Sequence, residues 1–96
     1  MAQFLITYDN HPPRDYSALY RLMAGWNAVR LAESVWLANL NGPASTVRDI
    51  VATTLDNFDT VSVLQLQHGT DWASQNVSAA ANAWLSAYVA PSQMAA

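Results

Sequence analysis

The sequence predicts an α+β fold in which a four-stranded antiparallel sheet carries two helices on one face. Apolar residues alternate in some segments, recur every three or four residues in others, and the two kinds of segment follow one another along the chain. The chain has 96 residues, of which 52% are hydrophobic and 11% charged. This composition excludes a disordered protein, and the length fits one small domain.

The first two predicted elements are a strand and a helix. Residues 3–9 are apolar on both faces, which predicts a strand buried on both sides at the centre of a sheet. Apolar residues spaced by three and four over 16–26 predict a helix, with Asp15 as its N-cap and Gly25 at its end.

The rest of the chain adds a hairpin, a helix, a strand and a last helix. Residues 28–32 and 34–40 are predicted to pair as two strands. A helical stripe runs over 47–58, alternation over 60–67 predicts a strand, and a third stripe predicts a helix over 78–89. The last helix could cover the remaining sheet edge, extend the helix layer or cross to a partner subunit.

The order of these elements is strand, helix, strand, strand, helix, strand and helix. It is the split βαβ, or ferredoxin-like, order. We therefore expect one ferredoxin-like domain over residues 1–90. Residues 91–96 begin with a proline followed by small and polar residues, and we expect a flexible tail there.

Composition also restricts the partners. The chain has four Arg, no Lys, no Cys and a formal net charge of −3, which disfavours strong binding to nucleic acid and excludes a disulfide scaffold. It lacks a long apolar segment and a signal peptide, so we expect no membrane contact and a cytoplasmic location. The chain has ten aromatic residues, which is many for the core of one small domain. Trp36, Trp72 and Trp84 are either core residues or part of a dimer interface.

Two short motifs resemble those of a known family. Residues 4–9, with the sequence FLITYD, resemble the opening strand of the CRISPR-associated Cas-two family and its SinR-like and VapD-like relatives. Arg30, followed by Ser-Val-Trp at 34–36, resembles the second motif of that group. The resemblance covers residues 3 to about 67, and the segment from 69 to 72 is most similar to the SinR-like branch.

The resemblance implies a homodimer in which Asp9 of each subunit faces its mate. It also implies that Asp9 is the catalytic and metal-ligating residue of an endoribonuclease, with Mg²⁺ as the cofactor and RNA as the partner. One carboxylate from each chain and several waters could hold Mg²⁺, because this ion prefers oxygen ligands. A dimer would carry twice −3, or −6, and this charge repels RNA.

The candidate residues of the site each have a second interpretation. Asp9 could instead cap the turn after the strand. The other candidates for the motif and its cleft are Tyr8, Asn10, His11, Arg30, Ser34 and Trp36.

Tyr8 could equally be a core residue, and His11 could be an acid or base or simply a solvated loop residue. Arg30 could contact phosphate or pair with Glu33, and Ser34 could line the cleft or fill a hydrogen-bonding position in a strand. His68 lies in another loop with the same two interpretations.

The sequence thus favours a dimeric interaction module that is inactive or weakly active. The alternative is a Mg²⁺-dependent endoribonuclease using Asp9 at the dimer interface. The low content of basic residues favours the interaction module over the endoribonuclease, because cleavage of RNA requires binding of its phosphates.

Overall fold

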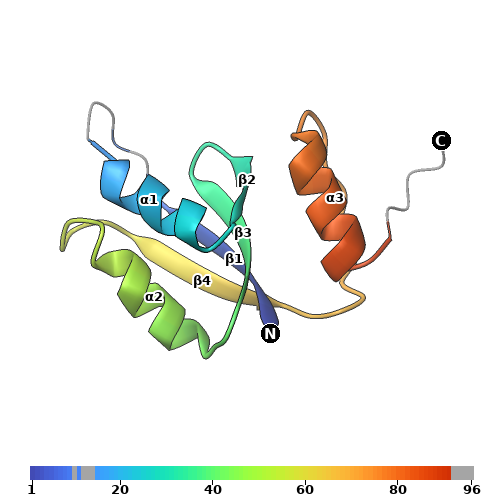
Figure 1. Ribbon diagram of the computed structural model, residues 1–96, viewed down its shortest axis with the longest axis horizontal. Coiled ribbons are helices and arrows are strands. Elements are labelled where there is room, and N and C mark those ends of the chain that lie inside the picture. The colour runs from blue at the N-terminus through green and yellow to red at the C-terminus, as the bar shows by residue number, and fades with distance from the viewer. Residues whose placement is uncertain (10, 12–14, 92–96) are drawn as a thin grey trace.

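The computed structural model describes residues 1–9, 11 and 15–91, and within them it has the predicted α+β architecture. Its elements in chain order are β1 (Ala2–Tyr8), α1 (Ser17–Gly25), β2 (Val29–Ala32), β3 (Val35–Leu40), α2 (Ala44–Ala52), β4 (Val61–Leu66) and α3 (Ala79–Tyr88). The strands form one antiparallel sheet in the order β2-β3-β1-β4. Figure 1 shows α1 and α2 in front of this sheet and α3 to one side. None of these helices is long and apolar enough to cross a bilayer.

Strand β1 lies at the centre of the sheet, between β3 and β4. Its Leu5 stands opposite Leu37 of β3 and Leu64 of β4. Every second residue of the strand, from position 4 to position 8, is buried on one face, and the residues between them are half-buried on the other. The prediction of a strand at the centre of the sheet is confirmed, but it is buried on one side only, because the face with Gln3, Leu5 and Thr7 is half-buried.

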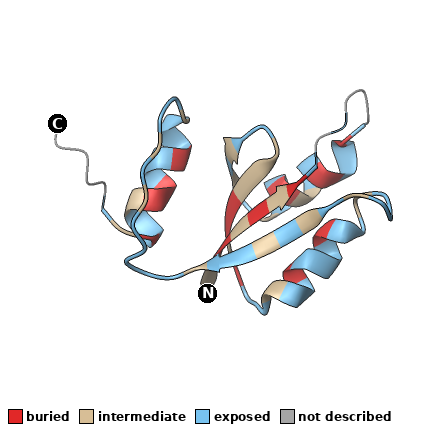
Figure 2. Ribbon diagram, turned by 180° about the vertical axis from the view of Figure 1, so that it is seen from behind, coloured by how far each residue is buried: buried red, intermediate tan, exposed pale blue. Residues whose placement is uncertain are grey.

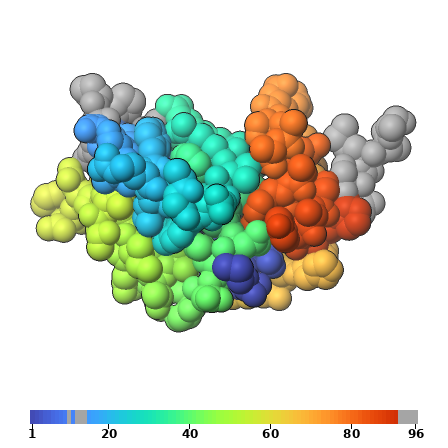
Figure 3. Space-filling view, viewed as in Figure 1, coloured from blue at the N-terminus to red at the C-terminus, as the bar shows by residue number. Residues whose placement is uncertain are grey.

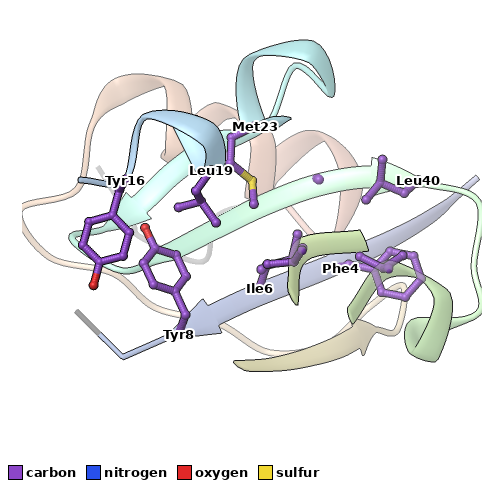
Figure 4. Close-up of a cluster of buried hydrophobic side chains, with 10 residues drawn as sticks. Phe4, Ile6, Tyr8, Tyr16, Leu19, Met23 and Leu40 are labelled. Atoms are coloured by element: carbon purple, nitrogen blue, oxygen red, sulfur yellow. The ribbon is translucent and has the colours of Figure 1, made fainter. Parts of the chain in front are cut away.

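The first core fills the space between the sheet and the helices α1 and α2. Its buried members are Phe4, Ile6, Tyr8, Tyr16, Leu19, Met23, Ala38, Leu40, Val47 and Val51. Figure 4 shows the rings of Tyr8 and Tyr16 at one end of this cluster and Phe4 and Leu40 at the other. The helical stripes predicted the helix residues of this core, because each stripe turns one face towards the sheet.

A second, smaller core lies on the opposite face of the sheet, under α3. Leu37 belongs to this core and its neighbour Ala38 to the first, and consecutive strand residues point to opposite faces. Leu37 is buried together with Trp84, Leu85 and Val89 of the last helix and its end. The structure therefore shows the last helix on the second face, beside the edge strand β2, which is none of the three predicted places.

The segment before α3 fixes where that helix lies. The Ser78 hydroxyl accepts a hydrogen bond from the Ala81 N–H at 3.0 Å, which confirms the predicted helix start. The Trp72 indole N–H donates to the Ala90 carbonyl at 2.9 Å, and the Gly69 N–H donates to the Val89 carbonyl at 2.7 Å. In the space-filling view α3 is in contact with the rest of the molecule (Figure 3).

The second face is left uncovered along β4. Figure 2 views the molecule from behind and shows no helix across this strand. Leu64, which lies on that face, has 52% of its surface exposed. The strand Val61–Leu66 has no charged residue, no proline and no glycine.

Helix α2 is shorter than its apolar stripe predicted. It ends at Ala52, because the hydroxyls of Thr53 and Thr54 donate to the carbonyls of Ile50 and Val51, at 2.6 Å and 2.7 Å. Side-chain hydrogen bonds of this kind compete with continued helix. Phe58, predicted to lie on the stripe, is instead in the following loop and is 96% exposed.

The predicted end of α1 at Gly25 is confirmed, but the residue that makes the turn after it is not the glycine. Gly25 is the last helical residue, but Asn27 is the residue with left-handed backbone, at φ 54°. The Ala28 N–H reaches the Met23 carbonyl at 2.9 Å, which is the bond of a Schellman motif with Asn27 in the position that often holds glycine.

At the start of α1 the N-cap position is Tyr16 and not Asp15. The Asp15 carboxylate accepts hydrogen bonds from the N–H and the hydroxyl of Ser17, and these bonds hold its pKa below the ordinary value. Asp15 therefore supports the start of α1 from the residue before the N-cap and not as the N-cap itself.

Candidate functional site

The end of β1 is the point where the predicted site residues meet. The Tyr8 N–H donates to the Ser34 carbonyl, and the Asp9 N–H donates to the Thr60 carbonyl, each at 3.2 Å. The turn before β3 and the residue before β4 thus flank Asp9. The Asp9 side chain is half exposed, so its carboxylate can reach a solute.

The Tyr16 hydroxyl bonds to the backbone of both Asp9 and His11. It donates to the Asp9 carbonyl at 3.2 Å and accepts from the His11 N–H at 2.7 Å. The two side chains come together as well, because His11 Nε2 lies 3.8 Å from Asp9 Oδ2. The structure therefore places His11 beside Asp9. Asn10 lies outside the described residues.

Tyr8 is a member of the first core, which is one of its two predicted interpretations. Its hydroxyl accepts a hydrogen bond from the Trp36 indole N–H at 3.2 Å. Burial raises the pKa of Tyr8, since the charged phenolate would lose solvation, and the Trp36 hydrogen bond opposes this only in part. Tyr8 therefore anchors the strand end below Asp9 and does not offer a charged group.

Arg30 lies flat against two aromatic rings. Its guanidinium carbon is 5.1 Å from the ring centre of Tyr20 and 5.2 Å from that of Trp36, within the range of cation–π contact. The same group donates to the Glu33 backbone carbonyl and to the Tyr20 hydroxyl. Arg30 does contact Glu33, as one interpretation predicted, but the acceptor in these bonds is the carbonyl oxygen.

The rings of four residues form a continuous row from the core to Arg30. Neighbouring ring centres are 5.7 Å apart for Tyr8 and Tyr16, 6.3 Å for Tyr16 and Tyr20, and 6.2 Å for Tyr20 and Trp36. Tyr16 and Tyr20 were predicted as helix-stripe residues only. Their spacing of four residues puts Tyr16, at the N-cap, and Tyr20 on one side of α1, but no sequence pattern indicates that Tyr16 lies beside Asp9.

Two other predicted residues, Ser34 and His68, contribute less to this site. Ser34 is half-buried in the turn before β3, so it is not a strand residue, and its carbonyl holds the end of β1. His68 follows Leu66, which pairs with Gln3 at the other end of β1, so His68 is remote from Asp9.

The three tryptophans divide between the cores. Trp36 packs against the first core, and Trp72 packs against the second, of which Trp84 is a buried member. These contacts agree with the interpretation of the three as core residues.

The Asp9 site is a surface feature and not a cavity. A groove of about 720 Å³ lies between β2 and the start of α3, and Arg30 and Glu33 line it, but Asp9 and His11 do not. Within the residues that the structure describes, no three His, Cys, Asp or Glu side chains are close enough together to hold a metal ion. Asp9 and His11 are therefore a pair, and any further ligand would have to come from elsewhere.

Comparison of the chain with protein-family models, with curated proteins and with solved structures finds no match. The assignment of a function therefore depends on the geometry and the chemistry of the chain itself.

Proposed function

We propose that the protein is a homodimeric interaction module built from two ferredoxin-like subunits, inactive or weakly active as a catalyst. The strand order β2-β3-β1-β4, with α1 and α2 packed on one face, supports the ferredoxin-like assignment. The resemblance of residues 4–9 and 34–36 to the Cas-two and SinR-like group supports the dimer.

The observation that carries the proposal is the uncharged edge strand β4. Soluble proteins usually protect a sheet edge with charged residues, proline or bulges, because free backbone groups invite pairing with another strand. The strand Val61–Leu66 has none of these charges or prolines, and its pairing with β1 is regular over six residues. Leu64 adds an exposed apolar side chain at its centre. Pairing with a second copy would cover both the edge and the leucine.

The alternation of side chains fixes the register of such a pair. In a two-fold antiparallel pair, residues opposite each other lie on the same face. Placing Leu64 opposite the same residue of the second copy joins the two exposed leucines on the uncovered face. Thr60 is four residues from that centre, so the two copies of Thr60 would lie about 26 Å apart at 3.3 Å per residue. Asp9 bonds to Thr60 from the β1 side, so the two Asp9 residues would be farther apart still. In this interface they would not face each other as the family resemblance implies.

Cysteine crosslinking tests the proposal directly, since the chain has no Cys. In the proposed pair the Cα atoms of position 64 are about 4.5–5.5 Å apart, within disulfide range. We expect Leu64→Cys to form a disulfide-linked dimer under mild oxidation and Asp9→Cys to form none. Light scattering of the wild type should give the mass of two chains.

Leu64→Lys is the complementary variant, because it places two positive charges face to face. We expect it to be a folded monomer by light scattering. The control is Ala24→Lys, which adds the same charge at an exposed position of α1 and should remain dimeric. A wild type that stays monomeric across micromolar concentrations would refute the dimer, and a disulfide through position 9 alone would refute this interface.

A second candidate is a metal-dependent endoribonuclease that uses Asp9, with Mg²⁺ as the expected ion. The observation in its favour is the half-exposed carboxylate at the end of β1, with His11 Nε2 only 3.8 Å away. When bound, Mg²⁺ would activate water for attack on a phosphodiester. Asp9 would hold the ion, and His11 could exchange a proton with the water or the leaving oxygen.

Cleavage of single-stranded RNA with Mg²⁺ by wild type and Asp9→Ala tests this candidate. The expected result is cleavage by the wild type and loss of it in the variant. Equal rates in the two proteins would remove Asp9 from the mechanism. An RNA left intact by the wild type would favour the interaction module.

A further inference from the structure

We propose that a pocket between the end of α1, β3 and α3 binds one uncharged aromatic ring of purine size, of the class to which the nucleobases belong. The pocket has a volume of about 290 Å³. The residues that line it are Met1, Trp26, Asn27, Asn39, Trp84 and Tyr88. Figure 3 shows α1, the start of the chain and α3 next to one another on one side of the molecule. The inference does not depend on the dimer or on RNA cleavage.

The four tryptophans differ in what their indole N–H groups bind. Those of Trp36 and Trp72 donate to other groups of the chain. Those of Trp26 and Trp84, which line the pocket, have no hydrogen bond in the part of the chain that the structure describes. A buried tryptophan usually finds a partner for this group.

Trp84 is the clearer of the two cases, because only 6% of its surface is exposed. Among the described residues, no buried side-chain nitrogen or oxygen lacks a hydrogen-bond partner. The Trp84 N–H has no such partner, so it reaches accessible space, and the pocket is the space that Trp84 lines. An acceptor atom of a ligand in this pocket would meet a donor that the fold already shields on its other sides.

Two asparagines add further hydrogen-bonding groups. Gln3 Nε2 donates to Asn39 Oδ1 at 3.1 Å, so the NH₂ group is what Asn39 has left to offer. Asn27 has no side-chain hydrogen bond among the described residues, so both ends of its amide are open. An open asparagine amide can pair with N7 and the N6 amino group of an adenine. The polar groups of the pocket are therefore mostly donors.

These groups favour a flat, uncharged ring as the occupant. The ring centres of Trp84 and Tyr88 are 5.3 Å apart, and Tyr88 is 44% exposed, so it has surface left on which a ring can stack. A purine accepts hydrogen bonds at its ring nitrogens, whereas every sugar hydroxyl also brings a donor that needs an acceptor. None of the described side chains that line the pocket is charged, so an ionised group would lose solvation there without compensation. The volume lies near the lower limit for ligand pockets, which suits a single ring system.

The turn after α1 already holds its part of the pocket in place. The backbone N–H groups of Trp26 and Asn27 donate to carbonyls of α1, each at 3.1 Å. Asn27 has the left-handed backbone that this turn requires, at φ 54°. Because the turn is already ordered, binding of a ring requires little further loss of backbone freedom.

Titration of the full chain with adenine, followed by ¹H–¹⁵N spectra of the four indole N–H groups, tests the inference. We expect adenine to shift the resonances of Trp26 and Trp84 to saturation and to leave those of Trp36 and Trp72 in place. Adenosine monophosphate and glucose are titrated in the same way. The monophosphate bound as tightly as adenine would indicate a nucleotide as the source of the ring, and weaker binding a free base. Both results support the site.

Asn27→Gly is the sharpest variant, because glycine takes the left-handed backbone without strain and the change removes only the amide. We expect it to fold as the wild type does and to bind adenine about tenfold more weakly. Asn76→Gly is the matched control, since Asn76 also has a left-handed backbone, at φ 63°, and lies outside the pocket. Its affinity should equal that of the wild type. Tyr88→Ala should weaken binding by at least about fivefold, through loss of stacking.

Adenine that shifts neither of the pocket indoles, or all four indoles equally, would overturn the inference. Equal adenine affinity of the wild type, Asn27→Gly and Tyr88→Ala would overturn it as well. Shifts of the pocket indoles by glucose and not by adenine would assign the pocket to a sugar and reject the ring. The mass of the protein by light scattering tests the dimer separately, so the two proposals can fail independently.

Discussion

The two faces of the sheet differ in how completely they are covered. On one face, α1 and α2 close a core in which Phe4, Ile6 and Leu19 are fully buried. On the other face, α3 covers Leu37 beside β2, while Leu64 stays exposed on β4. The closed face of β1 carries Phe4, Ile6 and Tyr8. The other face carries Gln3, Leu5 and Thr7 and is only half-buried, so the more apolar face is the one that two helices close.

The largest effect should come from the closed face. Phe4→Ala removes a fully buried ring, and we expect it to lower the free energy of unfolding by about 3–5 kcal/mol. The ring tip also packs against the chain at Gly42, where an added Cβ would lie 3.2 Å from it. Urea denaturation of the variant and the wild type measures this. A loss below about 1 kcal/mol would contradict a tightly packed first core.

On the half-covered face we expect a smaller and more local effect. Leu85→Ala, in the second core, should cost about 2 kcal/mol, at the low end of the usual range for leucine, because few residues pack there. Hydrogen exchange should accelerate in α3 more than in β1, since an element with a small buried surface opens locally. Equal acceleration in both elements would show that the two faces unfold as one unit.

Tyr8→Phe examines the polar end of the closed core. Loss of the acceptor for the Trp36 indole N–H should cost about 1 kcal/mol at neutral pH. The folded state raises the pKa of Tyr8, so its neutral form is favoured on folding. That contribution is complete below the ordinary value of 10.0, and it is lost as the pH rises through the higher pKa of the folded protein.

The measurement for this prediction is the unfolding free energy between pH 8 and the alkaline limit of stability. The wild type should lose stability at high pH more steeply than Tyr8→Phe. If the unfolding free energy of the wild type and of Tyr8→Phe fell equally steeply with pH, the loss of stability at high pH would come from groups other than Tyr8.

The smallest effect on folding should come from the uncovered face. Leu64→Lys changes an exposed residue, so the stability of the separated subunit should shift by less than about 0.5 kcal/mol. Denaturation at concentrations where the wild type is monomeric measures this change in the unfolding free energy of the subunit. A large loss would mean that Leu64 is buried within its own subunit, and the contrast between the two faces would then disappear.

Sequence patterns predicted each element of the fold but not where all of them end. The stripe from Val47 to Phe58 is regular, yet the hydroxyls of Thr53 and Thr54 end α2 early. Gly25 ends α1 as predicted, but Asn27 takes the left-handed backbone, because the chain turns two residues later to enter β2. Apolar spacing reports which residues face a core, and it does not report which carbonyls find another donor.

In the candidate site, too, the sequence predicted some features and the tertiary structure decided the others. The position of Asp9 at a strand end and of His11 two residues later follows from the sequence. That Tyr16 holds both backbones, and that Arg30 lies on Tyr20 and Trp36, depends on how α1 crosses the sheet. Such contacts join residues distant in sequence, and no local pattern specifies them.

By itself the sequence determined the α+β class, the order of the elements and the apolar strand at the centre of the sheet, because these follow from local periodicity. Only the tertiary structure decided that α3 crosses to the second face beside β2, that β4 stays open, and that a buried tyrosine holds Asp9 next to His11. The physical reason is that periodicity specifies which side of an element is apolar. Which apolar sides then meet depends on chain length, turns and the competition among all elements for the same sheet.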